Sequence, residues 1–136
     1  MLSVTLDSNA YISALQFNGR AARLLRMAAD GDIEIAISEP IIAEVIGVLR
    51  ERFGWDGYRL HTARQHIMSI TKFVAPSETL DVIDYDLPDN RILECAAAAS
   101  SEFIVSEDKE LLRLKEHGQA RIIKVAEMLH IVQPKR

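Results

Sequence analysis

Short apolar stretches alternate with longer amphipathic stretches along most of this 136-residue chain. Stretches rich in β-branched residues, bounded by turn formers, predict strands. Four are clear: residues 2–6, 33–37, 103–106 and 121–125. Residues 73–75 and 79–83 are less regular, and we expect them to form one interrupted strand or two short ones.

Helices are predicted between these strands, because apolar residues recur there at helical spacing. The stretches are residues 10–17, 21–29, 39–53, 58–70, 90–99, 108–115 and 126–130. Pro40 falls in the first turn of the third helix, where its missing N–H is harmless, and Gly54 ends that helix. Since strands alternate with helices and no tight hairpin signal is present, we expect a parallel sheet with helices on both faces.

Length and composition fit one globular domain that spans residues 1–136. The chain is 15.3 kDa, 49% hydrophobic and 26% charged, and it has no repeat or linker. Its net charge of -4 argues against binding nucleic acid through bulk positive charge, although an enzyme that grips nucleic acid locally stays possible.

The single cysteine and the lack of targeting signals predict a cytoplasmic protein. Cys95 cannot form an internal disulfide, and its Ala-rich surroundings predict a small buried residue rather than a catalytic thiol. No apolar run approaches the length of a membrane span, and the first residues lack the basic region of a signal peptide. We therefore expect no contact with a membrane.

Four acidic residues each stand just after a predicted strand or in the helix that follows one: Asp7, Glu44, Asp89 and Asp108. The carboxyl ends of parallel strands share one edge of a sheet, and ligands bind where the strand order reverses. We therefore expect these carboxylates to converge. The nearest basic residues, Arg91 and Lys109, are too few to neutralise them, and carboxylates gathered in this way usually hold a divalent metal.

Each acid also has a plainer explanation. Asp7 and Asp108 stand where a residue would cap the next helix, and Asp86 with Asp89 would form an approximate capping box. Glu44 would be a solvated surface residue. Capping and metal binding are compatible, because a carboxylate at a helix N-terminus can also face a cleft at the strand ends. The recurrence of all four favours the metal site.

Three segments carry a family resemblance: VTLDSNAYISAL, SEPIIAEVIGVL and DLPDNRILECAAAASSEFIVSEDKELLRL. Together they resemble the PIN domain (PilT N-terminus) family, and more narrowly the VapC-like toxin components of type II toxin–antitoxin systems. The resemblance covers essentially the whole chain. Its most specific part is an Asp-containing helix followed by an apolar strand that ends in Ser-Glu-Asp.

The resemblance implies a three-layer α/β/α sandwich with a mainly parallel, roughly five-stranded sheet. It implies a Mg²⁺- or Mn²⁺-dependent endoribonuclease with an RNA substrate, a cognate antitoxin and frequent homodimerisation. The residues carried over are the catalytic and metal-binding acids Asp7, Glu44, Asp89 and Asp108, with Asn9 and Ser106 orienting them. We expect Asp7 and Asp89 to bind the main ion directly, Glu44 and Asp108 to act through water or on a second ion, and metal-activated water to cleave the phosphodiester.

Three positions depart from the family pattern. Ser8 and Ser106 stand where threonine is commoner, and both keep the hydroxyl group. Glu107 stands where glycine is often found, so it adds a charge beside the site.

Other functions fit less well. The chain could be a PIN-like module that has lost catalysis and only binds RNA or a partner, although all four acids are present. A haloacid-dehalogenase-like phosphatase needs a second Asp two residues after the first, and Asn9 stands there. A receiver domain needs an Asp after a middle strand, where only Ser38 and Glu39 occur.

Aromatic residues concentrate between the third and fourth predicted helices, at Phe53, Trp55 and Tyr58. Two explanations stay open at this point. The side chains could pack into the core, or they could form a patch that binds a partner or a second copy of the chain.

Overall fold

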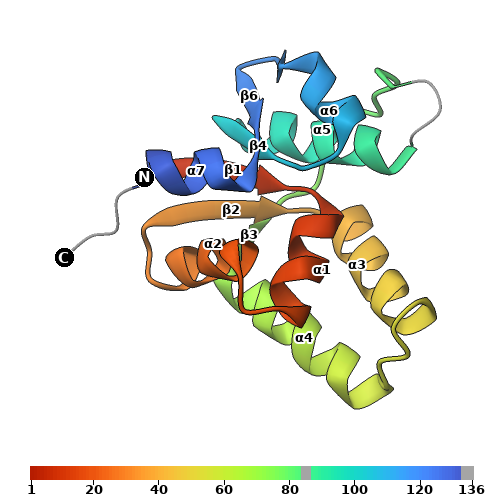
Figure 1. Cartoon of the computed structure of the whole chain (residues 1–136). Coiled ribbons are helices and arrows are strands. Elements are labelled where there is room, and N and C mark those ends of the chain that lie inside the picture. The colour runs from red at the N-terminus through yellow and green to blue at the C-terminus, as the bar shows by residue number, and fades with distance from the viewer. Residues whose placement is uncertain (84–86, 133–136) are drawn as a thin grey trace.

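A six-stranded sheet, in the order β3-β2-β1-β4-β6-β5, forms the centre of the computed structural model, which describes residues 1–83 and 87–132 (Figure 1). The strands are β1 (Leu2–Leu6), β2 (Ile33–Ile37), β3 (Thr71–Phe73), β4 (Phe103–Val105), β5 (Glu116–His117) and β6 (Ala120–Ile123). All pairings are parallel except that of β5 with β6. The mainly parallel sheet of five strands is confirmed, with β5 added at one edge.

Helices cover both faces of this sheet. Those in the described ranges are α1 (Ser8–Gln16), α2 (Arg20–Ala29), α3 (Glu39–Glu51), α4 (Gly57–Ile70), α5 (Leu87–Ala99), α6 (Lys109–Leu114) and α7 (Val125–Ile131). Right-handed crossovers place α1 to α4 on one face and α5 and α6 on the other. In agreement, α1 packs on α2 and α3, whereas α5 contacts β1, β2 and β4. Figure 1 shows α5 and α6 gathered on one side of the strands and α1, α2 and α4 on the other.

The central strands are buried on both faces. Ile35, Ala36 and Ile37 are consecutive in β2 and all buried, although their side chains point to alternate faces. Continuous apolar runs of this kind are typical of parallel strands sandwiched between helices, and each buried isoleucine contributes roughly 2 kcal/mol to folding. Of the helices in residues 1–83 and 87–132, none is long and apolar enough to span a bilayer.

The strand order reverses beside β1. The chain passes from β1 to β2 on one side, whereas β4 pairs with β1 on the other side. Leu6 and Val105 are partners in the register of β1 with β4. Asp7 and Ser106, which directly follow these two residues, therefore lie at the same edge of the sheet, in the crevice where ligands of such folds bind.

A short hairpin is present that the sequence pattern did not predict. β5 and β6 are joined by Gly118 and Gln119, and Gly118 has a φ of 60°. A glycine with positive φ at the first position of a two-residue turn suits a hairpin. No hairpin signal was visible in the sequence because β5 has only two residues, Glu116 and His117, which are too few to show alternation.

The interrupted strand was also predicted incorrectly. β3 begins two residues earlier than expected, and the second piece is a loop. Its backbone N–H groups donate to side chains of α5 instead of to a strand: Leu80 to Glu94 Oε2 at 2.7 Å, and Val82 and Ile83 to Asn90 Oδ1 at 2.9 Å each. These side chains satisfy the donors that a sheet partner would otherwise have taken.

Candidate functional site

Asp7 lies between β1 and α1 and is only 5% exposed. Its Oδ1 accepts a hydrogen bond of 2.8 Å from the N–H of Ala10, so the capping role expected from the sequence is confirmed. Its Oδ2 accepts a bond of 2.6 Å from Ser106 Oγ. One carboxylate thus begins a helix and also joins the ends of two strands.

Ser106 connects Asp7 to Asp108. Its hydroxyl donates to Asp7 and accepts a bond of 2.9 Å from the N–H of Asp108. Asp108 caps α6, since its Oδ1 accepts from the N–H groups of Glu110 at 2.8 Å and Leu111 at 3.3 Å. Capping by Asp108 is therefore confirmed, and the buried hydroxyl of Ser106 holds both acids in fixed positions.

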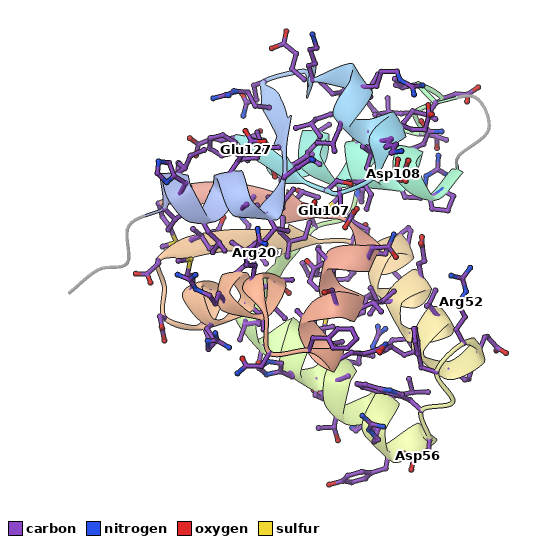
Figure 2. All side chains as sticks on the ribbon, in the orientation of Figure 1. Arg20, Arg52, Asp56, Glu107, Asp108 and Glu127 are labelled. Atoms are coloured by element: carbon purple, nitrogen blue, oxygen red, sulfur yellow. The ribbon has the colours of Figure 1, made fainter. Side chains whose placement is uncertain are left out.

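A cavity of about 290 Å³ opens at this edge of the sheet. It is lined by Asp7, Asn9, Ala10, Ser13, Ala21, Glu107, Asp108 and Val125. Figure 2 shows Glu107 and Asp108 in the segment that leads from β4 into α6. The cavity therefore has walls from α1, from the start of α2, from this loop and from the start of α7.

The cavity carries negative charge. Burial raises the pKa of Asp7, bonds from Ser106 and Ala10 lower it, and the charges of Asp108 and Glu107 raise it further. Within residues 1–83 and 87–132, the salt bridges that form do not include these three acids. The site is suited to a positive ligand.

The other two predicted acids lie on α3 and α5, which contact each other. Glu44 is half-buried, and Asp89 is buried in the first turn of α5. Asp86, its expected capping partner, lies outside the described residues. The cavity brings Asp7 and Asp108 together with Asn9, and Ser106 bonds to both acids. Glu44 on α3 and Asp89 on α5 lie outside the residues that line this cavity.

Two hydroxyl groups near Asp7 are buried: that of Ser8, which the sequence comparison with the family had noted, and that of Tyr11, which the sequence did not single out. Ser8 Oγ and Tyr11 Oη have no hydrogen-bond partner among the described residues. Burial, with smaller effects of Cys95 and Asp7, raises the pKa of Tyr11 well above its ordinary value. A buried polar group without a partner costs about 1–3 kcal/mol, and such groups call for a functional explanation. For Tyr11 the sequence signal was a tyrosine among the apolar residues Ala10 and Ile12 of α1.

The donor atoms of the cavity fit a hard divalent cation. They are carboxylate, amide and hydroxyl oxygens, which Mg²⁺ and Mn²⁺ prefer. However, the described parts of the chain contain no group of three or more Asp, Glu, His or Cys side chains close enough to hold a bare ion. Because Mg²⁺ ordinarily takes only one or two carboxylates and keeps several of its waters, Asp7 and Asp108 are the residues of this cavity that would hold such an ion.

Cys95 and the aromatic residues lie away from this cavity. Cys95 is buried as expected, and burial raises the pKa of its thiol to about 11, so that it stays protonated at neutral pH. Tyr58 is 81% exposed and Phe53 is also exposed, so core packing is wrong for both. Trp55 is half-buried beneath the Arg59 guanidinium, which lies 3.8 Å from its ring centre.

Comparison with known proteins identifies the family. Residues 3–110, which include all four acids, match the family model described as PIN domain. No curated protein sequence matches the chain. A chain of VapBC2 from Rickettsia felis, solved with a DNA fragment from its promoter, has a similar fold: the TM-score is 0.65 and the identity 14%, over 90% of this chain and 98% of that one. PIN domains are typically nucleases and generally use divalent metals. The match over residues 3–110 shows that the chain belongs to the PIN domain family.

Proposed function

We propose that this protein is a metal-dependent endoribonuclease and the toxin of a toxin–antitoxin pair. The observation that carries the proposal is the placement of Asp7. It is buried at the point where the strand order reverses, linked through Ser106 to Asp108, and surrounded by negative charge. Folding an unbalanced cluster of this kind is unfavourable unless a cation binds it.

Asp7 and Asp108, which line the cavity, would hold the ion directly, and Glu44 and Asp89, from α3 and α5, would bind it through water. This exchanges the roles that were first expected for Asp89 and Asp108. A bound divalent ion supplies positive charge against the phosphate oxygens and acidifies the attacking water. Ser106 holds the Asp7 carboxylate in one orientation, and Asn9 adds an amide to the cavity wall. No covalent nucleophile is needed, and the protonated thiol of Cys95 takes no part.

An antitoxin partner is supported by the relative and by the surface. VapBC2 of Rickettsia felis was solved bound to a DNA fragment from its promoter. On this chain, a hollow of about 280 Å³ between α1 and α4 is lined almost entirely by apolar atoms, with Trp55 and Tyr58 at its edge. We propose that the antitoxin covers this aromatic surface, in a cytoplasmic complex that contains two copies of the toxin.

The experiment for the nuclease is cleavage of labelled single-stranded RNA in Mn²⁺ and in EDTA. Asp7→Asn and Asp108→Asn should abolish Mn²⁺-dependent cleavage. Asp56→Asn is a matched control, because Asp56 also caps a helix, through a bond of 2.8 Å from the N–H of Arg59, but lies on α4 away from the cavity. RNA binding without cleavage by the wild type would favour an inactive binding module instead.

The partner is tested separately, by co-expression with the protein encoded by the adjoining gene. Tyr58→Ser should weaken the complex without changing RNA cleavage by the free toxin, since Tyr58 is exposed and outside the cavity. A complex that is unaffected by this substitution would show that the antitoxin binds another surface.

A further inference from the structure

Glu107 lies between the two residues that organise the cavity, Ser106 and Asp108, and its own side chain lines that cavity. Its Oε2 accepts a hydrogen bond of 2.9 Å from the N–H of Val125, the first residue of α7. Because Val125 also lines the cavity, this bond fixes the carboxylate of Glu107 between the loop after β4 and the start of α7.

A purely structural explanation for Glu107 is that it caps α7. Lys124 is the N-cap residue of that helix, and Glu107 satisfies one of the N–H groups that the helix leaves open. This role needs an acceptor atom but no charge, and a glutamine would serve equally well. A carboxylate has about four acceptor positions on its two oxygens, so the bond to Val125 leaves most of them available.

The size of the cavity suits an ion with its water shell. A water molecule occupies about 30 Å³ in the liquid, whereas the cavity measures about 290 Å³. Asp7, Glu107 and Asp108 line it together but are not close enough to hold a bare ion as a group of three. A carboxylate at this position can still accept hydrogen bonds from the waters of a cation that Asp7 and Asp108 bind.

We propose that Glu107 is a further ion-binding residue of this chain, which holds a hydrated divalent cation through the waters of that cation and raises its affinity. The inference rests on the proposed function, since it adds one residue to the same site. It assigns to Glu107 a charge-dependent role besides capping. Substituting a residue that contacts a metal through an intermediate group typically lowers the affinity of the protein for that metal about 10- to 100-fold.

The test is calorimetric titration of the full chain with MnCl₂, with no RNA present. Glu107→Gln keeps the size of the side chain and the acceptor for Val125, so α7 should stay capped. We expect its affinity for Mn²⁺ to fall about tenfold, while its melting temperature in EDTA does not fall below that of the wild type. Glu127→Gln is the control, because Glu127 is an exposed glutamate of α7 that caps the same helix without lining the cavity (Figure 2).

The outcomes separate this inference from the proposed function. If Asp7→Asn abolishes Mn²⁺ binding while Glu107→Gln binds as tightly as the wild type, Glu107 only caps α7 and the inference is overturned. If the wild type binds no Mn²⁺, or Asp7→Asn binds it normally, both proposals are overturned. A loss shared equally by Glu107→Gln and Glu127→Gln would reflect general charge and would also contradict the inference.

Discussion

Ser106 Oγ lies 2.6 Å from Asp7 Oδ2, which joins residues 99 positions apart in the chain. The bond is short and charge-assisted, and both partners are buried. It is possible because β1 and β4 are parallel neighbours that end at the same level. Ser106 thereby fixes the position of the Asp7 carboxylate relative to Asp108.

Ser106→Ala should reduce RNA cleavage strongly while leaving the fold intact. The substitution removes a hydrogen bond to Asp7 and the acceptor for the N–H of Asp108. We expect kcat/KM to fall about 10- to 100-fold, as for other residues that orient a ligand of a metal. Ser106→Thr is the control, because it keeps the hydroxyl group and should retain most of the activity. Equal activity in the alanine and threonine variants would show that the bond to Asp7 has no catalytic role.

Asp7→Asn should stabilise the metal-free protein at neutral pH. The folded state raises the pKa of Asp7 above its ordinary value of 3.8, chiefly by burial, with added effects of Asp108 and Glu107. An acid with a raised pKa is protonated in both states at low pH and costs stability once the pH rises above its ordinary pKa. The melting temperature of Asp7→Asn in EDTA should therefore exceed that of the wild type at pH 7, and the difference should vanish near pH 3.

The matched variant for this pH series is Asp56→Asn, which replaces a helix-capping aspartate that is exposed to solvent. The melting temperature of Asp56→Asn in EDTA at pH 7 should not exceed that of the wild type by a comparable amount. If Asp7→Asn is less stable than the wild type throughout the pH series, then the ionised Asp7 does not oppose folding and the charge argument fails.

Mn²⁺ should raise the melting temperature of the wild type in proportion to the logarithm of its concentration. A ligand that binds only the folded state adds about 2.7 kcal/mol at 100 times its dissociation constant, which is several degrees for a domain of this size. Asp7→Asn should show no such shift, because its cavity lacks the carboxylate at the centre of the site. The measurement is thermal unfolding in a series of MnCl₂ concentrations. Equal shifts in both proteins would mean that the ion binds elsewhere.

Asn90→Ala should destabilise the protein, although Asn90 does not line the cavity. Asn90 is fully buried, accepts from the N–H groups of Val82 and Ile83, and donates to the carbonyl of Ile83 at 2.6 Å. Its loss leaves buried backbone groups without their partners, so unfolding in urea should show a loss of roughly 2–4 kcal/mol.

Gln119→Ala gives the comparison for Asn90. Gln119 makes a single exposed bond of 2.6 Å, to the carbonyl of Ser100, and its loss should change stability by less than about 0.5 kcal/mol. If the two variants are equally stable, the loop before α5 does not depend on Asn90.

The sequence pattern predicted the elements that local composition controls. The bounds of β1 and β2 agree with prediction because their apolar, β-branched residues are buried on both faces. The loop with Leu80 could not be recognised, because its N–H groups bond to side chains that follow later, on α5. β5 was missed because its two residues carry no pattern.

The same distinction holds for the site. Asp7 and Asp108 could be placed at one sheet edge because both follow strands, and parallel strands end together. The bond from Ser106 to Asp7 depends on β1 and β4 being neighbours, and the order of strands in the sheet cannot be read from composition or spacing. The bond from Glu107 to Val125 depends on where α7 begins, so the sequence indicated only an added charge.

The most direct test of the central claim is anomalous diffraction from crystals grown or soaked with Mn²⁺. The account predicts an anomalous peak inside the cavity, within reach of the Asp7 and Asp108 carboxylates and absent from crystals of Asp7→Asn. An empty cavity at Mn²⁺ concentrations that support RNA cleavage, or a peak bound by other residues, would contradict it.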